Sequence, residues 1–256
     1  DPTADKYPDF NDEVNNIATK KFAETCIAQG INRITYASSA SIYDMGARAG
    51  DKLFTEETKV EPRGYYSTTK HKGELELLKL MERNPKFCPV ILRQGTVYGY
   101  SPRMRYDLVV NTFVRDAFTR GKLTVNQGGK QWRPLVSVGD VAKAHISCLA
   151  AEENKVKGEI FNVSFDNFQM WDVAHRVKHI LSDIIKAEVE IDYAERVDRN
   201  YRISNEKFQD KLVFRYDASS SIEDSTKKIA VSIKKDLDNG AKLEDLYNPK
   251  FNNLAW

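Results

Sequence analysis

Helical periodicity alternates with short β-prone runs along much of this 256-residue chain. Residues 12–29 place apolar side chains at helical spacing and stop at Gly30, and residues 31–39 then form an apolar run that ends in small residues. A helix over 65–81 and a strand over 88–93 continue the alternation. Parallel strands need helical crossovers on both faces of their sheet. The pattern therefore predicts an α/β, doubly wound parallel sheet of the Rossmann type.

The pattern continues beyond residue 100 and then loosens. It predicts helices over 109–120 and 139–151 and a strand over 159–164, followed by an amphipathic helix, a β-like run and a last helix. The looser part indicates a smaller α+β lobe appended to the sheet. The expected boundaries are 1–97 with 133–164 for the sheet domain and 98–132 with 165–256 for the smaller lobe.

Composition removes several classes of protein. The net charge of +2 comes from scattered lysines and arginines among nearly as many acids, which disfavours a nucleic-acid partner. No apolar run approaches the roughly 20 residues that cross a bilayer, and no secretory leader opens the sequence, so we expect a soluble, cytoplasmic protein without a membrane partner.

No metal site is expected. The three cysteines, Cys26, Cys88 and Cys148, lack the paired spacing of a zinc site or the density of a disulfide framework. His175 and His179 stand four residues apart on one predicted helix, but no third ligand is evident, so a solvated helix face is the expected interpretation. We expect His145 to be a core histidine with satisfied hydrogen bonds.

The stretch "GYYSTTKHKGE" holds a tyrosine and a lysine four residues apart, Tyr66 and Lys70. Residues at this spacing share one helix face, so the ammonium can act on the phenol. The pair opens its helix, where the amide dipoles add a second effect that lowers a phenol pKa from its usual value near 10. Such a tyrosine can take a proton from an alcohol near neutral pH. The alternative is that Tyr66 and Lys70 are a solvent-facing helical pair without a catalytic role.

Several ordered motifs carry a family resemblance over most of the chain: "ITYASSASIYD", "GYYSTTKHKGE", "VILRQGTVYGYSPR", "RPLVSVGDVAKAH" and "GEIFNVS". Together they resemble the extended short-chain dehydrogenase/reductases that act on nucleotide sugars, the group of UDP-glucose 4-epimerase. The resemblance implies a catalytic triad of Ser39, Tyr66 and Lys70, with Ser38 as the alternative if the register differs by one residue.

The resemblance also implies binding residues. Ser38, Tyr66 and Lys70 are expected to contact the nicotinamide cofactor, Lys70 at its ribose, with the backbone of Thr96 and Val97 beside the nicotinamide. The residues expected to bind the nucleotide-diphosphate sugar are Ser39, Asn111, Arg133 and Arg199. An arginine fork suits a diphosphate, although Arg133 could instead bridge to Asp140.

Two departures from the family pattern bear on function. The 4,6-dehydratases carry an Asp-Glu pair where this chain has Ala40 and Ser41, so dehydration, which needs an acid and a base, is disfavoured. None of the 13 glycines forms the turn that meets a dinucleotide pyrophosphate. We expect the first βα units of the family fold to be missing from this sequence and present in the natural protein. A cofactor-free relative is the alternative.

These observations lead us to expect an NAD-dependent nucleotide-sugar epimerase similar to UDP-glucose 4-epimerase. NADP stays open, because the residue that selects between the cofactors follows the second strand of such folds. A nucleotide-sugar reductase or decarboxylating relative is one alternative, and a non-catalytic Rossmann sensor or binding module is another. The family further implies a homodimer in which the helices 12–29 and 65–81 form a four-helix bundle.

Overall fold

The computed structural model describes residues 2–44, 52–196, 199–217 and 220–247. Its contacts divide the chain into two compact units, each assembled from three separate segments. Unit 1 comprises residues 1–95, 141–164 and 201–215, and unit 2 comprises residues 96–140, 165–200 and 216–256.

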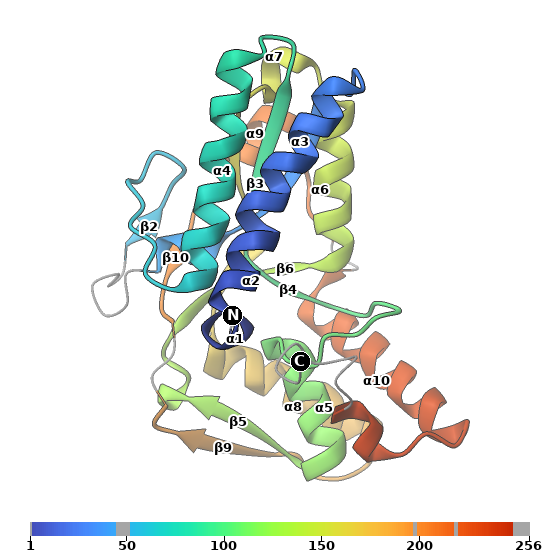
Figure 1. The fold of residues 1–256 in the computed structure, drawn as a ribbon. Helices are drawn as coiled ribbons and strands as arrows, with labels where there is room; N and C mark the ends of the chain where they lie inside the picture. Colours follow the sequence, from blue (N-terminus) through green and yellow to red (C-terminus); the bar gives the residue numbers. More distant parts are fainter. Residues whose placement is uncertain (1, 45–51, 197–198, 218–219, 248–256) are drawn as a thin grey trace. The chain divides into compact units, whose positions relative to one another are not determined.

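Unit 1 is built on a parallel sheet whose strand order is β1-β3-β7 (Figure 1). The strands are β1 (Arg33–Ser39), β3 (Cys88–Gln94) and β7 (Ile160–Val163). Every residue of β3 except Gln94 is buried, as expected of a central strand covered on both faces. All three strands end at the same edge of the sheet, where open α/β sheets bind their ligands. The predicted parallel α/β architecture is confirmed.

Helices cover both faces of this sheet. Successive residues of a strand point to opposite faces. On β1, the Tyr36 hydroxyl meets the backbone of α4 (Tyr65–Arg83), whereas the neighbouring Thr35 hydroxyl bonds to His145 of α6 (Val138–Ala150). Helix α3 (Ala18–Ala28) packs beside α4, so that α3 and α4 share one face and α6 lies on the other (Figure 1).

The predicted helix over 12–29 is three consecutive pieces in the structure. They are α2 (Pro8–Asp12), a π-helical turn η1 (Glu13–Ile17) and α3, preceded by the short α1 (Pro2–Lys6). A π-helical turn inside a helix exposes a carbonyl to an outside donor, and such turns are frequent at functional sites. Here the carbonyl of Asn15 accepts a hydrogen bond of 3.0 Å from the Tyr36 hydroxyl.

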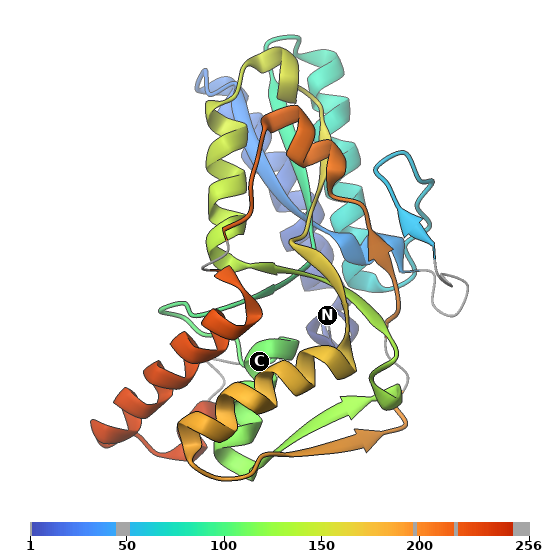
Figure 2. The ribbon, with the colours of Figure 1, turned by 180° about the vertical axis from the view of Figure 1, so that it is seen from behind.

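The remaining elements of unit 1 are a two-stranded parallel sheet and two short helices near β7. Strand β2 (Leu53–Phe54) pairs in parallel with β10 (Arg202–Ile203), and α9 (Glu206–Leu212) packs on β7 through an edge-to-face contact between Phe208 and Phe161 (Figure 2). Helix α7 (Glu153–Val156) precedes β7. The segment 201–215 therefore belongs to unit 1, whereas the expected boundaries gave it to the smaller lobe.

In its described part, unit 2 contains two small sheets and three α-helices that pack around one core. Its sheets are β4-β6-β8, with β8 antiparallel, and the parallel pair β5-β9. The strands are β4 (Thr96–Tyr98), β5 (Lys122–Asn126), β6 (Trp132–Ser137), β8 (Asp166–Gln169) and β9 (Glu190–Ala194). The helices are α5 (Val109–Arg120), α8 (Met170–Ile185) and α10 (Ile222–Asp238).

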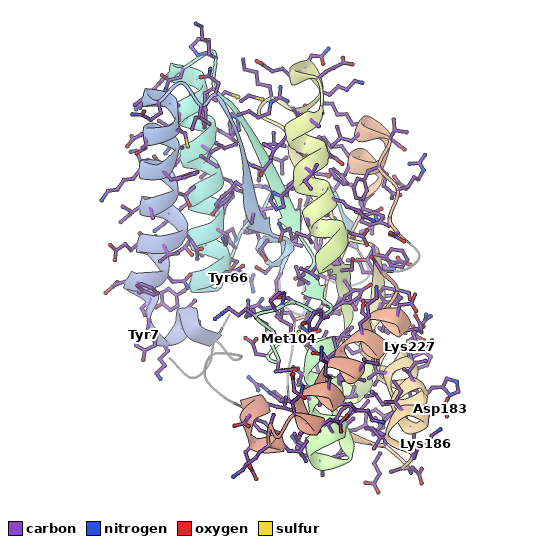
Figure 3. All side chains as sticks on the ribbon, turned by 90° about the vertical axis from the view of Figure 1, so that its right-hand side faces the viewer. Tyr7, Tyr66, Met104, Asp183, Lys186 and Lys227 are labelled. Atoms are coloured by element: carbon purple, nitrogen blue, oxygen red, sulfur yellow. The ribbon has the colours of Figure 1, made fainter. Side chains whose placement is uncertain are left out.

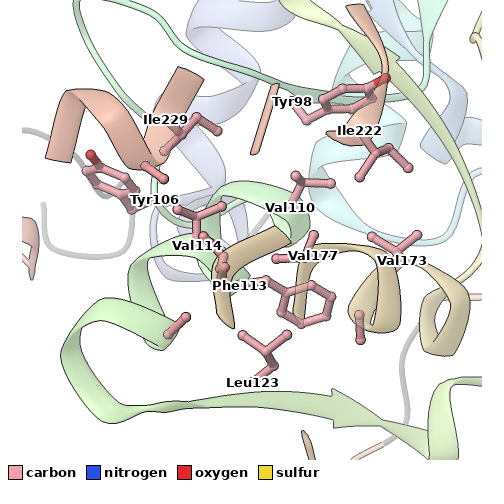
Figure 4. Close-up of a cluster of buried hydrophobic side chains, with 14 of the residues drawn as sticks. Tyr98, Tyr106, Val110, Phe113, Val114, Leu123, Val173, Val177, Ile222 and Ile229 are labelled. Carbon is pink, nitrogen blue, oxygen red and sulfur yellow. The ribbon is translucent and has the colours of Figure 1, made fainter. Parts of the chain in front are cut away.

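An apolar core joins the elements of unit 2. Side chains from α5, α8 and α10 interdigitate above β5 (Figure 4). Phe113, Leu123 and Val177 are nearly or fully buried in this cluster. Strand β6 lies in this unit because its partners are β4 and β8, although residues 133–140 were expected in the sheet domain. The assignment of the two units to cofactor and substrate stays a prediction.

Candidate active site

Helix α4 carries the predicted tyrosine and lysine in its first two turns. The helix begins after Gly64, whose amide donates to Ser67 Oγ at 3.1 Å, and the same hydroxyl donates back to the Gly64 carbonyl at 3.0 Å. This closed first turn holds Tyr66 and Lys70 on one face, with the Lys70 Nζ 5.9 Å from the centroid of the Tyr66 ring. Figure 3 labels Tyr66 at the amino-terminal end of α4. The pair is half-buried, unlike the exposed neighbour Tyr65.

The two serines at the end of β1 have different surroundings. Ser38 is buried, and its hydroxyl donates to Glu74 of α4 at 2.5 Å. Ser39 is half-buried, and its Oγ lies 2.9 Å from Ser41 Oγ and accepts from the Ser41 amide at 3.2 Å. Helix α4 contacts both β1 and the 3₁₀ turn Ala40–Tyr43 that follows Ser39. Both hydroxyls therefore have protein partners, but only that of Ser38 is bonded to a buried carboxylate; the role of Ser39 toward a substrate stays a prediction.

A buried ion pair fixes α4 to the ends of β1 and β3. The Glu74 carboxylate accepts from Arg93 Nη2 at 2.7 Å and Nε at 3.0 Å, and both side chains are almost completely buried. His71 also lies 3.3 Å from Glu74. Burial raises the pKa of Glu74, but hydrogen bonds from His71 and Arg93 outweigh it and hold that pKa below its usual range. Glu74 is therefore a charged anchor one helical turn after Lys70.

The same hydrogen-bond network continues from Arg93 to β7, the strand on the other side of β3 from β1. Arg93 Nη1 donates to the Tyr43 hydroxyl at 2.7 Å, and that hydroxyl donates to Asn162 on β7 at 2.9 Å. Burial raises the pKa of Tyr43 to about 12, so it stays a donor at neutral pH. Sequence reasoning missed Glu74, Arg93 and Tyr43. Only the lysine-to-glutamate spacing of four, which repeats the tyrosine-to-lysine spacing, could have indicated Glu74.

Lys70 is a half-buried cation. Burial lowers its pKa to about 8, although the nearby Glu74 charge acts in the opposite direction. A lysine so placed can be charged at neutral pH and still exchange a proton slightly above it. This environment is typical of a functional lysine, because a structural surface lysine keeps its charge in water.

The nicotinamide end of a dinucleotide fits these residues. Tyr66, Ser39 and a lysine ammonium stand near the carboxyl edge of a parallel sheet, which is where such cofactors bind. The residues present would hold the ribose and face the nicotinamide, but this sequence holds no glycine-rich turn for the pyrophosphate. Ala40 and Ser41, at the positions of the dehydratase carboxylates, are buried and supply no carboxyl group.

The other predicted binding residues belong to unit 2. Thr96 and Val97 are half-buried on β4, next to β6. Arg133 is buried on β6, and the Trp132 amide before it donates to the Asn200 side chain at 2.9 Å. This bond links the segment that contains Arg199 to the strand that contains Arg133. Asp140 accepts instead from Ser137 and from the Asp217 amide.

Asn111 has a different role within unit 2. Its side-chain oxygen accepts from the Gly99 amide at 3.1 Å, and its nitrogen donates to the Arg105 carbonyl at 3.0 Å. The amide therefore fastens the loop between β4 and α5 to the start of α5. Gly99 has a positive φ of 114°, a conformation that favours glycine at this close approach. A direct contact between Asn111 and a substrate stays a prediction.

The histidines behave as expected. His145 makes hydrogen bonds through both ring nitrogens, to Gln94 at 2.9 Å and to Thr35 at 2.8 Å, and burial lowers its pKa. His175 and His179 are exposed. Among the residues that the structure describes, no group of three or more potential ligands could hold a metal ion. Nor does any described helix have the length and apolar character needed to cross a bilayer.

Comparisons of the sequence with a family model and with known proteins agree on one family. The model of the "NAD dependent epimerase/dehydratase family" matches residues 5–164. The chain is 29% identical over 160 residues to the "Putative UDP-glucose 4-epimerase" of Methanocaldococcus jannaschii, covering 61% of this chain and 49% of that protein. It is 27% identical over 182 residues to the decarboxylating sterol-4-alpha-carboxylate 3-dehydrogenase of Bos taurus, covering 66% of this chain and 49% of that protein. The chain spans about half the length of these relatives.

The fold has close structural neighbours. The structure of RMD from Pseudomonas aeruginosa, which is complexed with NADPH, superposes with a TM-score of 0.77 at 20% identity. The match covers 92% of this chain and 78% of that one, and it confirms the Rossmann-type architecture. Since the family model covers more than half of the 256 residues, the chain belongs to the NAD-dependent epimerase/dehydratase family.

Proposed function

We propose that this protein is an NAD-dependent nucleotide-sugar epimerase similar to UDP-glucose 4-epimerase. The observation that carries the proposal is the juxtaposition in unit 1 of Tyr66 with the half-buried Lys70 on α4, the helix that contacts the 3₁₀ turn following Ser39 at the end of β1. The name of the Methanocaldococcus jannaschii relative and the family match support the same class of reaction.

The residues would divide the chemistry as follows. Tyr66 takes the proton from a sugar hydroxyl and returns it after the carbinol carbon has been oxidised and reduced. Ser39 donates a hydrogen bond to the same oxygen, and Lys70 keeps the phenolate form of Tyr66 accessible and donates to the cofactor ribose. A bound nicotinamide supplies the hydride chemistry. NAD is the proposed cofactor and NADP the alternative.

Substrate recognition is proposed for unit 2. Arg133 and Arg199, whose segments are linked by the hydrogen bond from the Trp132 amide to the Asn200 side chain, would clamp the diphosphate of a nucleotide sugar, because two guanidinium groups match its oxygens. The backbone of Thr96 and Val97 would lie beside the nicotinamide. Asn111 would act through the loop that it fastens or through the substrate phosphates.

Product analysis tests the function. The natural protein is incubated with UDP-, TDP-, GDP- and CDP-sugars and NAD, and products are identified by chromatography and mass spectrometry. An epimer of one sugar, with no net change in absorbance at 340 nm, is the expected result. Net reduction of the cofactor or loss of carbon dioxide would favour the oxidising or decarboxylating alternative, which the bovine relative's name represents. No conversion of any sugar would favour the binding module.

A homodimer in the cytoplasm completes the proposal. Val14, Ile17 and Phe22 on the η1–α3 segment and Leu75 on α4 are exposed apolar side chains, as a helix-to-helix interface requires. Part of this surface, including Val14 and Phe22, also lines a groove that reaches β1. All three cysteines are free and buried, as suits a reducing compartment. Light scattering that finds only monomer at micromolar concentration would reject the dimer.

A further inference from the structure

Two aromatic rings hold the Lys70 ammonium. Its Nζ lies 5.1 Å from the centroid of the Tyr36 ring and 5.9 Å from that of Tyr66. Both distances fall within the roughly 6 Å over which a ring face attracts a cation. No carboxylate of the described residues forms an ion pair with Lys70. The cation is therefore stabilised by uncharged faces, and its N–H donors stay available.

Three elements fix the Tyr36 ring in place. Tyr36 is 9% exposed on β1, and its hydroxyl donates to the Asn15 carbonyl in the π-helical turn at 3.0 Å, with the Lys70 carbonyl at 3.4 Å. Gly73 of α4 makes room for this hydroxyl, since a Cβ there would come within 2.5 Å of both Tyr36 Oη and Asn15 O. The ring cannot move without disturbing β1, η1 and α4 together.

Tyr36 is not an acid or a base itself. Burial raises the pKa of its phenol well above the usual range, so the hydroxyl stays protonated and remains a donor to Asn15. Tyr36 therefore acts on Lys70 only through its ring face, which contacts the ammonium, and through the fixed position of that ring.

We propose that Tyr36 is a positioning residue for Lys70, whose ammonium it holds against the ring of Tyr66 without neutralising it. A carboxylate in the same place would bind the N–H donors and cancel the charge that acts on the phenol. An aromatic face stabilises the cation and leaves both available. The inference rests on the proposed function, in which Tyr66 and Lys70 act as a pair.

The surrounding charges give the sign of the expected effect. Glu74 of α4 is the charged group that acts on Lys70, and it is itself paired with Arg93 of β3 and bonded to His71. On α2, Asp12 pairs with Lys72. Because a ring face favours the charged lysine, its removal at unchanged burial must lower the Lys70 pKa further.

Titration of Lys70 tests the proposal without requiring turnover. The natural protein, labelled with ¹³C at lysine Cε, is titrated by NMR, and the Lys70 signal is assigned by its loss in Lys70→Gln. Tyr36→Phe keeps the ring and removes the hydroxyl, whereas Tyr36→Leu removes both but preserves an apolar neighbour. We expect wild-type titration in the Phe variant and a pKa lower by about 0.4–1.5 units in the Leu variant.

The other outcomes overturn the proposal. If Tyr36→Leu titrates like Tyr36→Phe, the ring does not hold the cation; if both fall equally, the hydroxyl is responsible. Tyr36→Met, whose flexible side chain fills the same space, replaces the Leu variant if circular dichroism shows that the latter is unfolded. Failure of the proposed function would instead appear in the product analysis and would leave these titrations unchanged.

Discussion

Replacing Glu74 by glutamine removes the charge that anchors α4 to the sheet. The Glu74 side chain is 1% exposed and that of Arg93 is 4% exposed, and they meet at 2.7 Å. Glutamine keeps the size of the side chain but turns one acceptor oxygen into a donor that faces the guanidinium. Arg93 then stays charged and buried without a counter-charge. Breaking a buried pair in this way costs about 3–5 kcal/mol of unfolding free energy.

A matched control lies two residues away on the same helix. Glu76 pairs with Lys20 at 3.2 Å and Lys79 at 2.9 Å, but all three side chains are at least partly exposed. Exposed pairs contribute about 0–1 kcal/mol, so Glu76→Gln should cost no more than that. Urea unfolding of both variants, followed by far-UV circular dichroism, measures the difference.

Fluorescence separates the two units in the same experiment. Trp132 and Trp171, two of the three tryptophans, belong to unit 2, so their emission reports that unit, whereas circular dichroism reports both units. We expect the loss in Glu74→Gln to appear in the dichroism transition. Equal losses in Glu74→Gln and Glu76→Gln would refute the argument that this buried pair anchors the helix.

Three more predictions follow from unit 1. Ser38→Ala should lower the free energy of unfolding in urea by about 1.5–3 kcal/mol, because the Ser38 hydroxyl bonds to a buried carboxylate. Ser39→Ala should instead reduce turnover and leave stability nearly unchanged. If Ser39→Ala lost stability and Ser38→Ala lost turnover, the two serines would have the opposite roles. The pKa of Glu74 is depressed in the folded protein, so its stabilisation is present above the ordinary pKa near 4.3 and is lost as pH falls through the folded value. The stability difference between wild type and Glu74→Gln should accordingly shrink below about pH 4, as acid titration followed by dichroism would show. Gly73→Ala should destabilise by about 1–3 kcal/mol although alanine favours helices, since its Cβ meets Tyr36; a thermal unfolding midpoint at or above that of wild type would contradict the close approach.

Local periodicity predicted the longer helices better than the short strands. The helix expected over 109–120 is α5 (Val109–Arg120), because its apolar face repeats without interruption and Gly121 ends it in the left-handed conformation. The helix expected over 12–29 is interrupted by the π-helical turn, whose Asn15 carbonyl accepts a hydrogen bond from the Tyr36 hydroxyl, a contact distant in sequence. Apolar spacing contains no trace of such a contact.

In the candidate site, too, residues close in sequence could be predicted, and contacts between distant segments could not. Tyr66 and Lys70 could be found from sequence because both lie on one helix, four residues apart. The partners of Glu74 could not, since Ser38 and Arg93 come together only through the parallel pairing of β1 with β3. The short strands β5 and β6 were missed for a related reason. β5 pairs with β9, and β6 pairs with β4 and β8, and in each pair the two partner residues are more than 30 positions apart in the sequence.

One comparison tests the central claim most directly: the turnover of Tyr66→Phe against that of Tyr65→Phe in the natural protein with its nucleotide sugar and NAD. Each variant loses one hydroxyl at adjacent positions, but Tyr65 is 56% exposed. Loss of a general acid-base group costs about 10²–10⁴-fold in rate. We predict such a loss in Tyr66→Phe with cofactor still bound, and near wild-type turnover in Tyr65→Phe. Near wild-type turnover in Tyr66→Phe would contradict the proposed role of this tyrosine.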